Sequence, residues 1–144
     1  MITFEQLTEA SEAAVQDINQ LLPQLRESTD EHTCTLAELQ EIVSDKKIAF
    51  MVAKDGEKII GMASLYIMSK LSKDVAHVED VVIDGGYRGQ GLGEKIMQAL
   101  INVARERGVK TLTLTSRPER VAGNKLYQKL GFQQKITNVY RLKL

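Results

Sequence analysis

The sequence has a single cysteine, no net charge and no long apolar run. Cys34 alone cannot form an internal disulfide or a metal site built from several cysteines, which suits a reducing compartment. Nineteen basic residues balance nineteen acidic ones, so no overall field attracts nucleic acid or an anionic membrane. We therefore expect neither of these partners, and we expect any anionic ligand to be held by a local site.

Segments that would direct the chain to a membrane are also missing. No apolar run approaches the length of a membrane span, and the first residues, MITFEQLTEASEAAVQ, are charged within five positions and lack an apolar signal-peptide core. The sequence contains no repeats and no linker. These features predict a cytoplasmic protein with one domain over residues 1–144, whose 43% hydrophobic content can bury a real core.

The apolar periodicity predicts an α/β (α+β) fold with a mixed sheet flanked by helices. The expected strands cover residues 2–7, 47–54, 58–69, 76–84, 110–116 and 137–144, and the expected helices cover 9–25, 35–45, 92–107 and 118–130. Pro23 should interrupt the first helix, and Thr35 should cap the second. The strand-helix-strand unit over 76–116 should be parallel and right-handed, because a helical crossover joins parallel neighbours.

The segment YRGQGLGEKIMQAL, residues 87–100, joins a strand of this unit to its helix. Such a loop offers unpaired N–H groups at a helix N-terminus, and Gly89, Gly91 and Gly93 let the backbone approach a bulky anion. Arg88 can add a charge-assisted contact. The spacing fits neither a Walker A loop nor a dinucleotide fingerprint. We interpret the segment as a pyrophosphate cradle; a turn that uses glycine only for tightness is the alternative.

Two motifs carry a resemblance to a known family. Arg88, Gly91 and Gly93 form Arg-x-x-Gly-x-Gly after the strand VEDVVID, and NKLYQKLGF, residues 124–132, contains Tyr-x-x-x-Gly-Phe. With the order of elements, these motifs resemble the GCN5-related N-acetyltransferase (GNAT) family. The resemblance implies a mostly antiparallel sheet of six or seven strands with four helices and a central parallel strand-helix-strand unit. It also implies acetyl-CoA as cosubstrate and no metal.

The resemblance also implies where acetyl-CoA binds. The implied cofactor residues are Val81, Val82, Ile83, Arg88, Gly89, Gln90, Gly91, Leu92, Gly93, Arg120, Asn124 and Tyr127. The pantetheine arm would follow the strand at residues 81–83, and a strand that splays there would free an N–H for the thioester carbonyl. Arg120, Asn124 and Tyr127 share one helical face. Many family members carry asparagine at position 120, so either Arg120 or Asn124 makes the polar contact.

Three residues are candidates for the chemistry. Tyr127 matches the proton donor of the family, since a phenol of pKa about 10 stays protonated at neutral pH; a packed aromatic with a surface hydroxyl is the alternative. Glu79 and Asp80 are candidate bases, and the strand HVEDVVI resembles that of glucosamine-phosphate N-acetyltransferases. Neighbours in a strand point oppositely, so we expect one of the two to be structural. Glu79 is the preferred base, directly or through a water.

The predicted activity is direct acetyl transfer from acetyl-CoA to the primary amine of a small molecule. Acetylation of a protein or peptide is the alternative within the same class. A non-catalytic acyl-CoA sensor or a nucleotide-binding module would keep the loop at 88–93 without needing Tyr127 or Glu79. His32 and His77 have no partner at the spacing of metal ligands, so no metal site is expected. A homodimer is an open alternative to a monomer.

Overall fold

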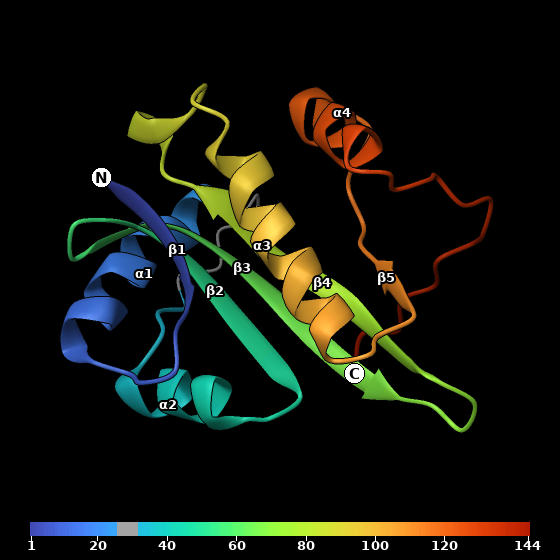
Figure 1. Ribbon diagram of the computed structural model, residues 1–144, viewed down its shortest axis with the longest axis horizontal. Helices are drawn as coiled ribbons and strands as arrows, with labels where there is room; N and C mark the ends of the chain where they lie inside the picture. The colour runs from blue at the N-terminus through green and yellow to red at the C-terminus, as the bar shows by residue number, and fades with distance from the viewer. Residues whose placement is uncertain (26–31) are drawn as a thin grey trace.

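The computed structural model describes residues 1–25 and 32–144 (Figure 1). The loop expected over residues 26–34 therefore lies partly outside the described residues. Within them, five strands form one sheet in the order β1-β2-β3-β4-β5. The strands are β1 (Ile2–Gln6), β2 (Ile48–Asp55), β3 (Lys58–Ser69), β4 (Asp74–Ile83) and β5 (Thr111–Thr113). The first four are antiparallel neighbours, and β5 pairs in parallel with β4, as predicted.

Helices cover both faces of this sheet. They are α1 (Glu12–Leu25), α2 (Leu36–Ser44), α3 (Leu92–Glu106) and α4 (Val121–Lys129). Figure 1 shows α3 crossing one face, where it packs on alternate residues of the strands. We call this layer the α3-side core; it contains Ala49, Met51, Ala53, Ala63, Leu65, Ala76, Val78, Ile96, Met97 and Leu100. The opposite layer, the α1-side core, contains Ile18, Leu21, Leu39, Phe50, Val52, Met62 and Val82.

The local signals act as expected in α2 but not in α1. Thr35 caps α2, and its hydroxyl accepts a hydrogen bond of 3.2 Å from the amide of Glu38. The expected interruption of α1 at Pro23 is wrong, because the helix continues to Leu25. Pro23 lies in the last turn, where its missing N–H removes one bond from a helix already fixed by buried side chains such as Leu21.

A β-bulge and an early end of pairing open the second half of β4. Met62 pairs with Val82 and Ser64 with Glu79, so two residues of β4 oppose one residue of β3. One of these two, Asp80, has a φ of 55°, the left-handed conformation that non-glycine residues seldom adopt. On the other side of β4, pairing with β5 spans only three residue pairs and ends where His77 faces Thr113. The two parallel strands therefore separate beyond His77.

The end of the chain differs from the prediction. Residues 133–144 contain no strand, although the segment 137–144 was expected to close the sheet. The count of five strands in the described chain is accordingly lower than six or seven. A strand needs a hydrogen-bonding neighbour, and no described strand pairs with this segment. The last helix also begins at Val121 rather than at residue 118.

Candidate active site

The glycine-rich loop connects β4 to α3 and adopts left-handed backbone at two positions. A short 3-10 helix, η1 (Gly85–Tyr87), precedes it, and Gly91 is the N-cap of α3. Gly89 has a φ of 80° and Gly91 a φ of 74°, so both positions favour glycine. A Cβ built at either one would meet no atom within 4 Å, which leaves open space above the loop. The loop therefore has room for a ligand.

The third glycine has a different role from the one expected. A Cβ at Gly93 would lie 3.4 Å from Cδ2 of Leu126, so this glycine allows α3 to approach α4. The side chain of Leu92 is buried, and only its backbone can reach a ligand. The first N–H groups of a helix have no partner within the helix, and here they follow Gly91. The backbone of residues 89–93 therefore lies at the N-terminus of α3, where the helix dipole favours an anion.

Contacts from distant parts of the chain hold the residues that precede this loop. The side-chain amide of Gln24 donates to Oδ1 of Asp84 at 2.7 Å and accepts a hydrogen bond of 2.8 Å from the amide of Gly85. The hydroxyl of Tyr87 donates to Oδ2 of Asp55 at 2.7 Å. About 30 to 60 positions separate these partners in the sequence. The sequence therefore contains no local signal for this support.

The two side chains expected beside the anion are exposed. Arg88 donates through Nε to the carbonyl of Ile83 at 3.3 Å, so its guanidinium lies near the end of β4. Gln90 is exposed in the loop itself. Glu94, in the first turn of α3, is paired with Lys129 at 2.7 Å. The positive charge of Lys129 therefore offsets the negative charge of Glu94 at the N-terminus of α3.

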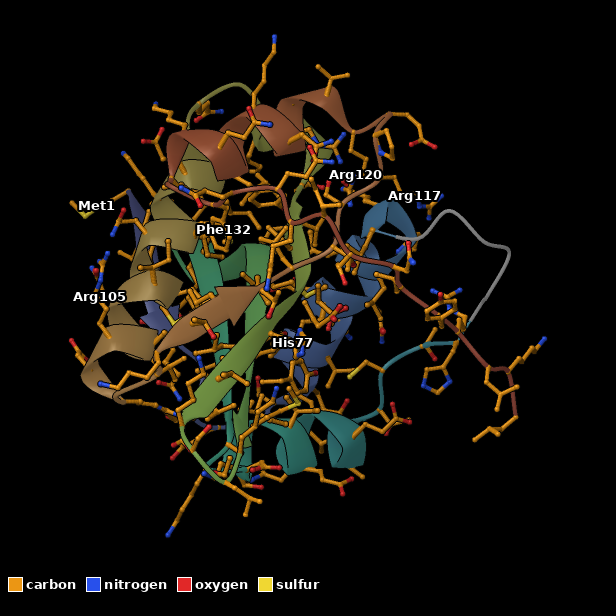
Figure 2. The ribbon with its side chains drawn as sticks, turned by 90° about the vertical axis from the view of Figure 1, so that its right-hand side faces the viewer. Met1, His77, Arg105, Arg117, Arg120 and Phe132 are labelled. Carbon is orange, nitrogen blue, oxygen red and sulfur yellow. The ribbon has the colours of Figure 1, made fainter. Side chains whose placement is uncertain are left out.

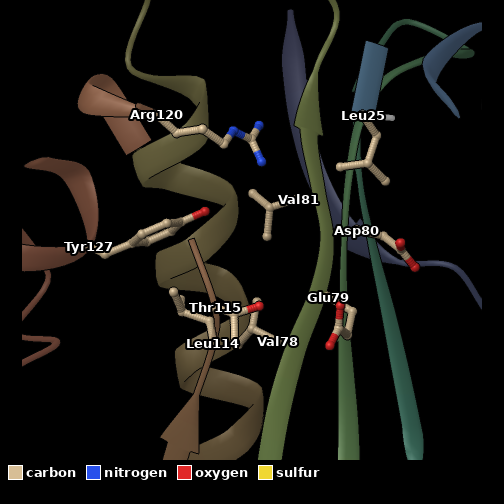
Figure 3. Close-up of a pocket in the computed structure, with 9 residues that line it drawn as sticks. All are labelled: Leu25, Val78, Glu79, Asp80, Val81, Leu114, Thr115, Arg120 and Tyr127. Carbon is tan, nitrogen blue, oxygen red and sulfur yellow. The ribbon is translucent and has the colours of Figure 1, made fainter. Parts of the chain in front are cut away.

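A pocket of about 150 Å³ lies where β4 and β5 separate (Figure 3). It is lined by Leu25, Val78, Glu79, Asp80, Val81, Leu114, Thr115, Arg120 and Tyr127. This volume corresponds to roughly five water molecules. It suits a reacting group such as an acetyl thioester rather than a whole nucleotide. Leu114 and Thr115 were not predicted, although their place after a strand parallel to β4 is a usable signal.

Tyr127 projects into this pocket from α4. Figure 3 shows its hydroxyl directed toward Val81, which also lines the pocket. The ring is half-buried and packs edge-on against Phe132, with ring centroids 6.0 Å apart. Burial raises the pKa of Tyr127, while the positive charge of Arg120 lowers it. The phenol is therefore protonated at neutral pH.

The helical spacing predicts Arg120 and Asn124 on one face of α4, but the structure places their side chains in different surroundings. Arg120 is the N-cap residue of α4, and its guanidinium enters the pocket near Val81 (Figure 3). Asn124 lies within the helix, where its side-chain amide donates to the carbonyl of Arg117 at 2.8 Å. Asn124 therefore holds the segment before α4 that carries Arg117 and Arg120 (Figure 2). Of Arg120 and Asn124, only Arg120 lines the pocket.

The acidic pair lines the same pocket from the opposite side of β4. Figure 3 shows Glu79 and Asp80 across this strand from Tyr127. Glu79 is exposed, whereas Asp80 is partly buried in the bulge. Tyr66 of β3 was not predicted. Burial raises its pKa, and the charges of Asp80 and Glu79 raise it further, so this phenol lies within the field of both carboxylates.

The three residues of β4 predicted to hold the pantetheine arm have side chains in different surroundings. Val81 lines the pocket, Val82 is buried in the α1-side core, and Ile83 packs against the α3-side core. The side chain of Val82 is therefore closed to a ligand, whereas Ile83 is only partly buried. In the part of the chain that the structure describes, no three His, Cys, Asp or Glu side chains are grouped to hold a metal ion. None of the described helices has the length and apolar character of a membrane span.

Comparisons with known proteins agree with this arrangement. Residues 14–132 match the model of the acetyltransferase (GNAT) family. The chain is 32% identical over 125 residues to glucosamine 6-phosphate N-acetyltransferase of Trypanosoma brucei brucei, which covers 81% of this chain and 83% of the relative. It is 33% identical over 126 residues to probable glucosamine 6-phosphate N-acetyltransferase 2 of Oryza sativa subsp. japonica, which covers 80% and 73%.

A solved structure is similar over its full length. The crystal structure of a Trypanosoma brucei acetyltransferase superposes with a TM-score of 0.79 at 29% identity and covers 100% of both chains. The fold prediction from the two sequence motifs is therefore confirmed.

Proposed function

The chain belongs to the acetyltransferase (GNAT) family and is an acetyl-CoA-dependent enzyme, and we propose that its acceptor is the primary amine of a small molecule. Glucosamine 6-phosphate, the acceptor named for the two curated relatives, is the first compound to test. One observation carries the proposal. The opening beside β4 brings a protonated phenol and a carboxylate to one pocket, next to an anion cradle at a helix N-terminus.

The cradle and the opened strand would bind the cofactor. The N–H groups at residues 89–93 can donate hydrogen bonds to a pyrophosphate, and the positive guanidinium of Arg88 complements its negative charge. From there the arm of the cofactor can extend along β4 into the pocket, where Arg120 offers a polar contact. When bound, acetyl-CoA supplies a thioester, an acyl group activated for attack by an amine.

The reaction needs two proton transfers, and a different side chain in the pocket would carry each one. An ammonium acceptor must lose a proton before it can attack, and Glu79 is exposed at the pocket wall to take it, directly or through water. Tyr127 holds a proton on the other side of β4 for the departing sulfur. Because side chains supply both the acid and the base, we propose that transfer requires no metal, and a chelator should leave turnover unchanged.

An amine panel tests the proposed acceptor. Purified enzyme and acetyl-CoA are incubated with glucosamine 6-phosphate, unphosphorylated glucosamine and short peptides with a free N-terminus, and release of free thiol is followed. We expect release well above hydrolysis with a small amine. Turnover with peptides alone would contradict the proposal and support the alternative of a peptide acetyltransferase. Binding of acetyl-CoA without acetylation of any amine would favour a sensor.

Glu79→Gln tests the base. Turnover should fall most at low pH, where the acceptor amine most needs help to lose its proton, and it should partly recover as pH rises. Affinity for acetyl-CoA, measured by calorimetry, should not change. Glu106→Gln, at the exposed end of α3, is the matched control. An equal loss at every pH would mean that Glu79 positions the acceptor and does not take its proton.

A further inference from the structure

The last turn of α1 reaches both the pocket and the residues that lead into the glycine-rich loop. Leu25 lines the pocket, and Figure 3 shows it across β4 from Tyr127. The neighbouring Gln24 is hydrogen-bonded to Asp84 and Gly85, which lie 60 and 61 positions further along the chain. Because buried side chains fix α1 on the sheet, this turn is a firm support for both places.

The side-chain amide of Gln24 binds two different groups at the end of β4. Its Nε2 donates to Oδ1 of Asp84 at 2.7 Å, and its Oε1 accepts from the backbone amide of Gly85 at 2.8 Å. Only this orientation of the amide fits, because a carboxylate accepts and a backbone N–H donates. Nε2 also donates to the carbonyl of Gln20 at 3.2 Å, which holds the amide against its own helix. One planar group therefore fixes both the distance and the orientation of the chain at residues 84–85.

Asp84 stands at the junction between the strand and the loop. Its amide donates to the carbonyl of Ile60 at 2.8 Å, and it is the N-cap residue of η1. Its side chain makes no capping bond to η1, and its carboxylate accepts from Gln24 instead. Only η1 and Arg88 lie between Asp84 and the left-handed backbone of Gly89. A displacement at this junction would therefore reach the loop through a very short segment.

We propose that Gln24 is a positioning residue for acetyl-CoA: from the turn that carries Leu25 to the pocket, it fixes where the glycine-rich loop begins. The inference rests on the proposed course of the cofactor from the loop along β4 into the pocket. A ligand that contacts both places binds more tightly when the protein already holds them in the right relative position, because binding then does not have to order them. Gln24 acts through Asp84 and Gly85 and not by contact with the reacting atoms.

Removal of the amide tests the positioning role. Gln24→Ala deletes the bonds to Asp84 and Gly85, so the dissociation constant of acetyl-CoA, measured by calorimetry, should rise roughly tenfold. Gln16→Ala is the matched control, because Gln16 is exposed on the same helix, and it should bind acetyl-CoA as the wild type does. A Gln24→Ala variant that melts at a lower temperature but keeps wild-type affinity would overturn the proposal, because Gln24 would then only stabilise the fold.

The wild type separates this inference from the proposed function. If the wild type does not bind acetyl-CoA, the proposed cofactor site is wrong and the role of Gln24 falls with it. If the wild type binds and Gln24→Ala binds equally well, only the role of Gln24 is wrong.

An exchange of the two hydrogen-bonding partners gives a second test. In Gln24→Glu the new carboxylate faces that of Asp84, and repulsion should weaken acetyl-CoA binding at least as much as Gln24→Ala does. Adding Asp84→Asn reverses the bond: the new amide can donate to the new carboxylate, which still accepts from the amide of Gly85. The double variant should recover an affinity within about threefold of the wild type, as expected for directly coupled residues. A folded double variant that binds no better than Gln24→Glu would overturn the proposal.

Discussion

β4 and the last nine residues, 136–144, have similar sequence patterns and different structures. Both contain β-branched or aromatic residues in alternation, and a strand was predicted at each. β4 lies between β3 and β5 of the same chain and forms ten residues of strand, whereas residues 136–144 pair with no described strand and form none. The difference shows that alternation identifies side chains that require burial, whereas a strand also requires an available edge.

β4 itself repeats this contrast within one strand. Its first half is paired on both sides, while its second half has a bulge against β3 and no pairing with β5 in the described residues. The pocket lies at this less paired half, and the proposed anion cradle follows it in the chain. Incomplete pairing in β4 therefore opens the pocket, whereas the lack of a paired strand at the C-terminus leaves apolar side chains exposed.

The largest effect that this comparison predicts is at Gly91. Gly91→Val should weaken acetyl-CoA binding by roughly 100-fold or more, because several charge-assisted contacts of about 1.5–3 kcal/mol each depend on that backbone. Left-handed valine should also cost about 1–2 kcal/mol of folding stability. Calorimetry and thermal melting measure the two effects.

The control for Gly91 separates strain from binding. Gly108 has a φ of 73°, and a Cβ there also meets open space, but it lies beyond the other end of α3. Gly108→Val should destabilise the fold by a similar amount and leave affinity unchanged. Normal binding by Gly91→Val would show that the cofactor lies elsewhere.

Much of the fold follows from the sequence because its signals are local. The Thr35 cap and the α3 periodicity each depend on neighbouring residues, and both predictions are confirmed. The support of the loop by Gln24 and Asp55 could not be predicted, since these contacts depend on how distant elements pack. The prediction of a closing strand over 137–144 is wrong for the same reason: the alternation is a local pattern, but a strand also needs a neighbouring strand, which can lie far away in the sequence.

The next largest effect is expected at Tyr127. Tyr127→Phe keeps the packing against Phe132 and removes the hydroxyl, so turnover should fall by roughly 100-fold while acetyl-CoA affinity changes little. Since burial raises the pKa of this phenol, the wild type should lose activity through its deprotonation only above about pH 10. Donors with a more acidic leaving thiol should suffer less from the substitution. Full turnover in the variant, with chemistry rate-limiting, would assign the proton to water.

The smallest effect is expected at Arg120, which distinguishes the two candidates for the polar contact. Arg120→Gln should weaken acetyl-CoA binding about two- to fivefold, as expected for an exposed charge worth up to about 1 kcal/mol. Its cation favours the phenolate of Tyr127, so its removal should raise the pKa of Tyr127 further and move the alkaline loss of activity to higher pH. Ultraviolet titration of tyrosinate measures this shift directly, and Lys125→Gln on the exposed side of α4 is the charge-matched control.

Asn124→Ala should instead reduce the free energy of unfolding by about 1 kcal/mol, because it loses the hydrogen bond to the carbonyl of Arg117. It should leave the affinity for acetyl-CoA unchanged. If Asn124→Ala weakens binding and Arg120→Gln does not, the contact belongs to Asn124, and the β5–α4 segment must rearrange when the cofactor binds.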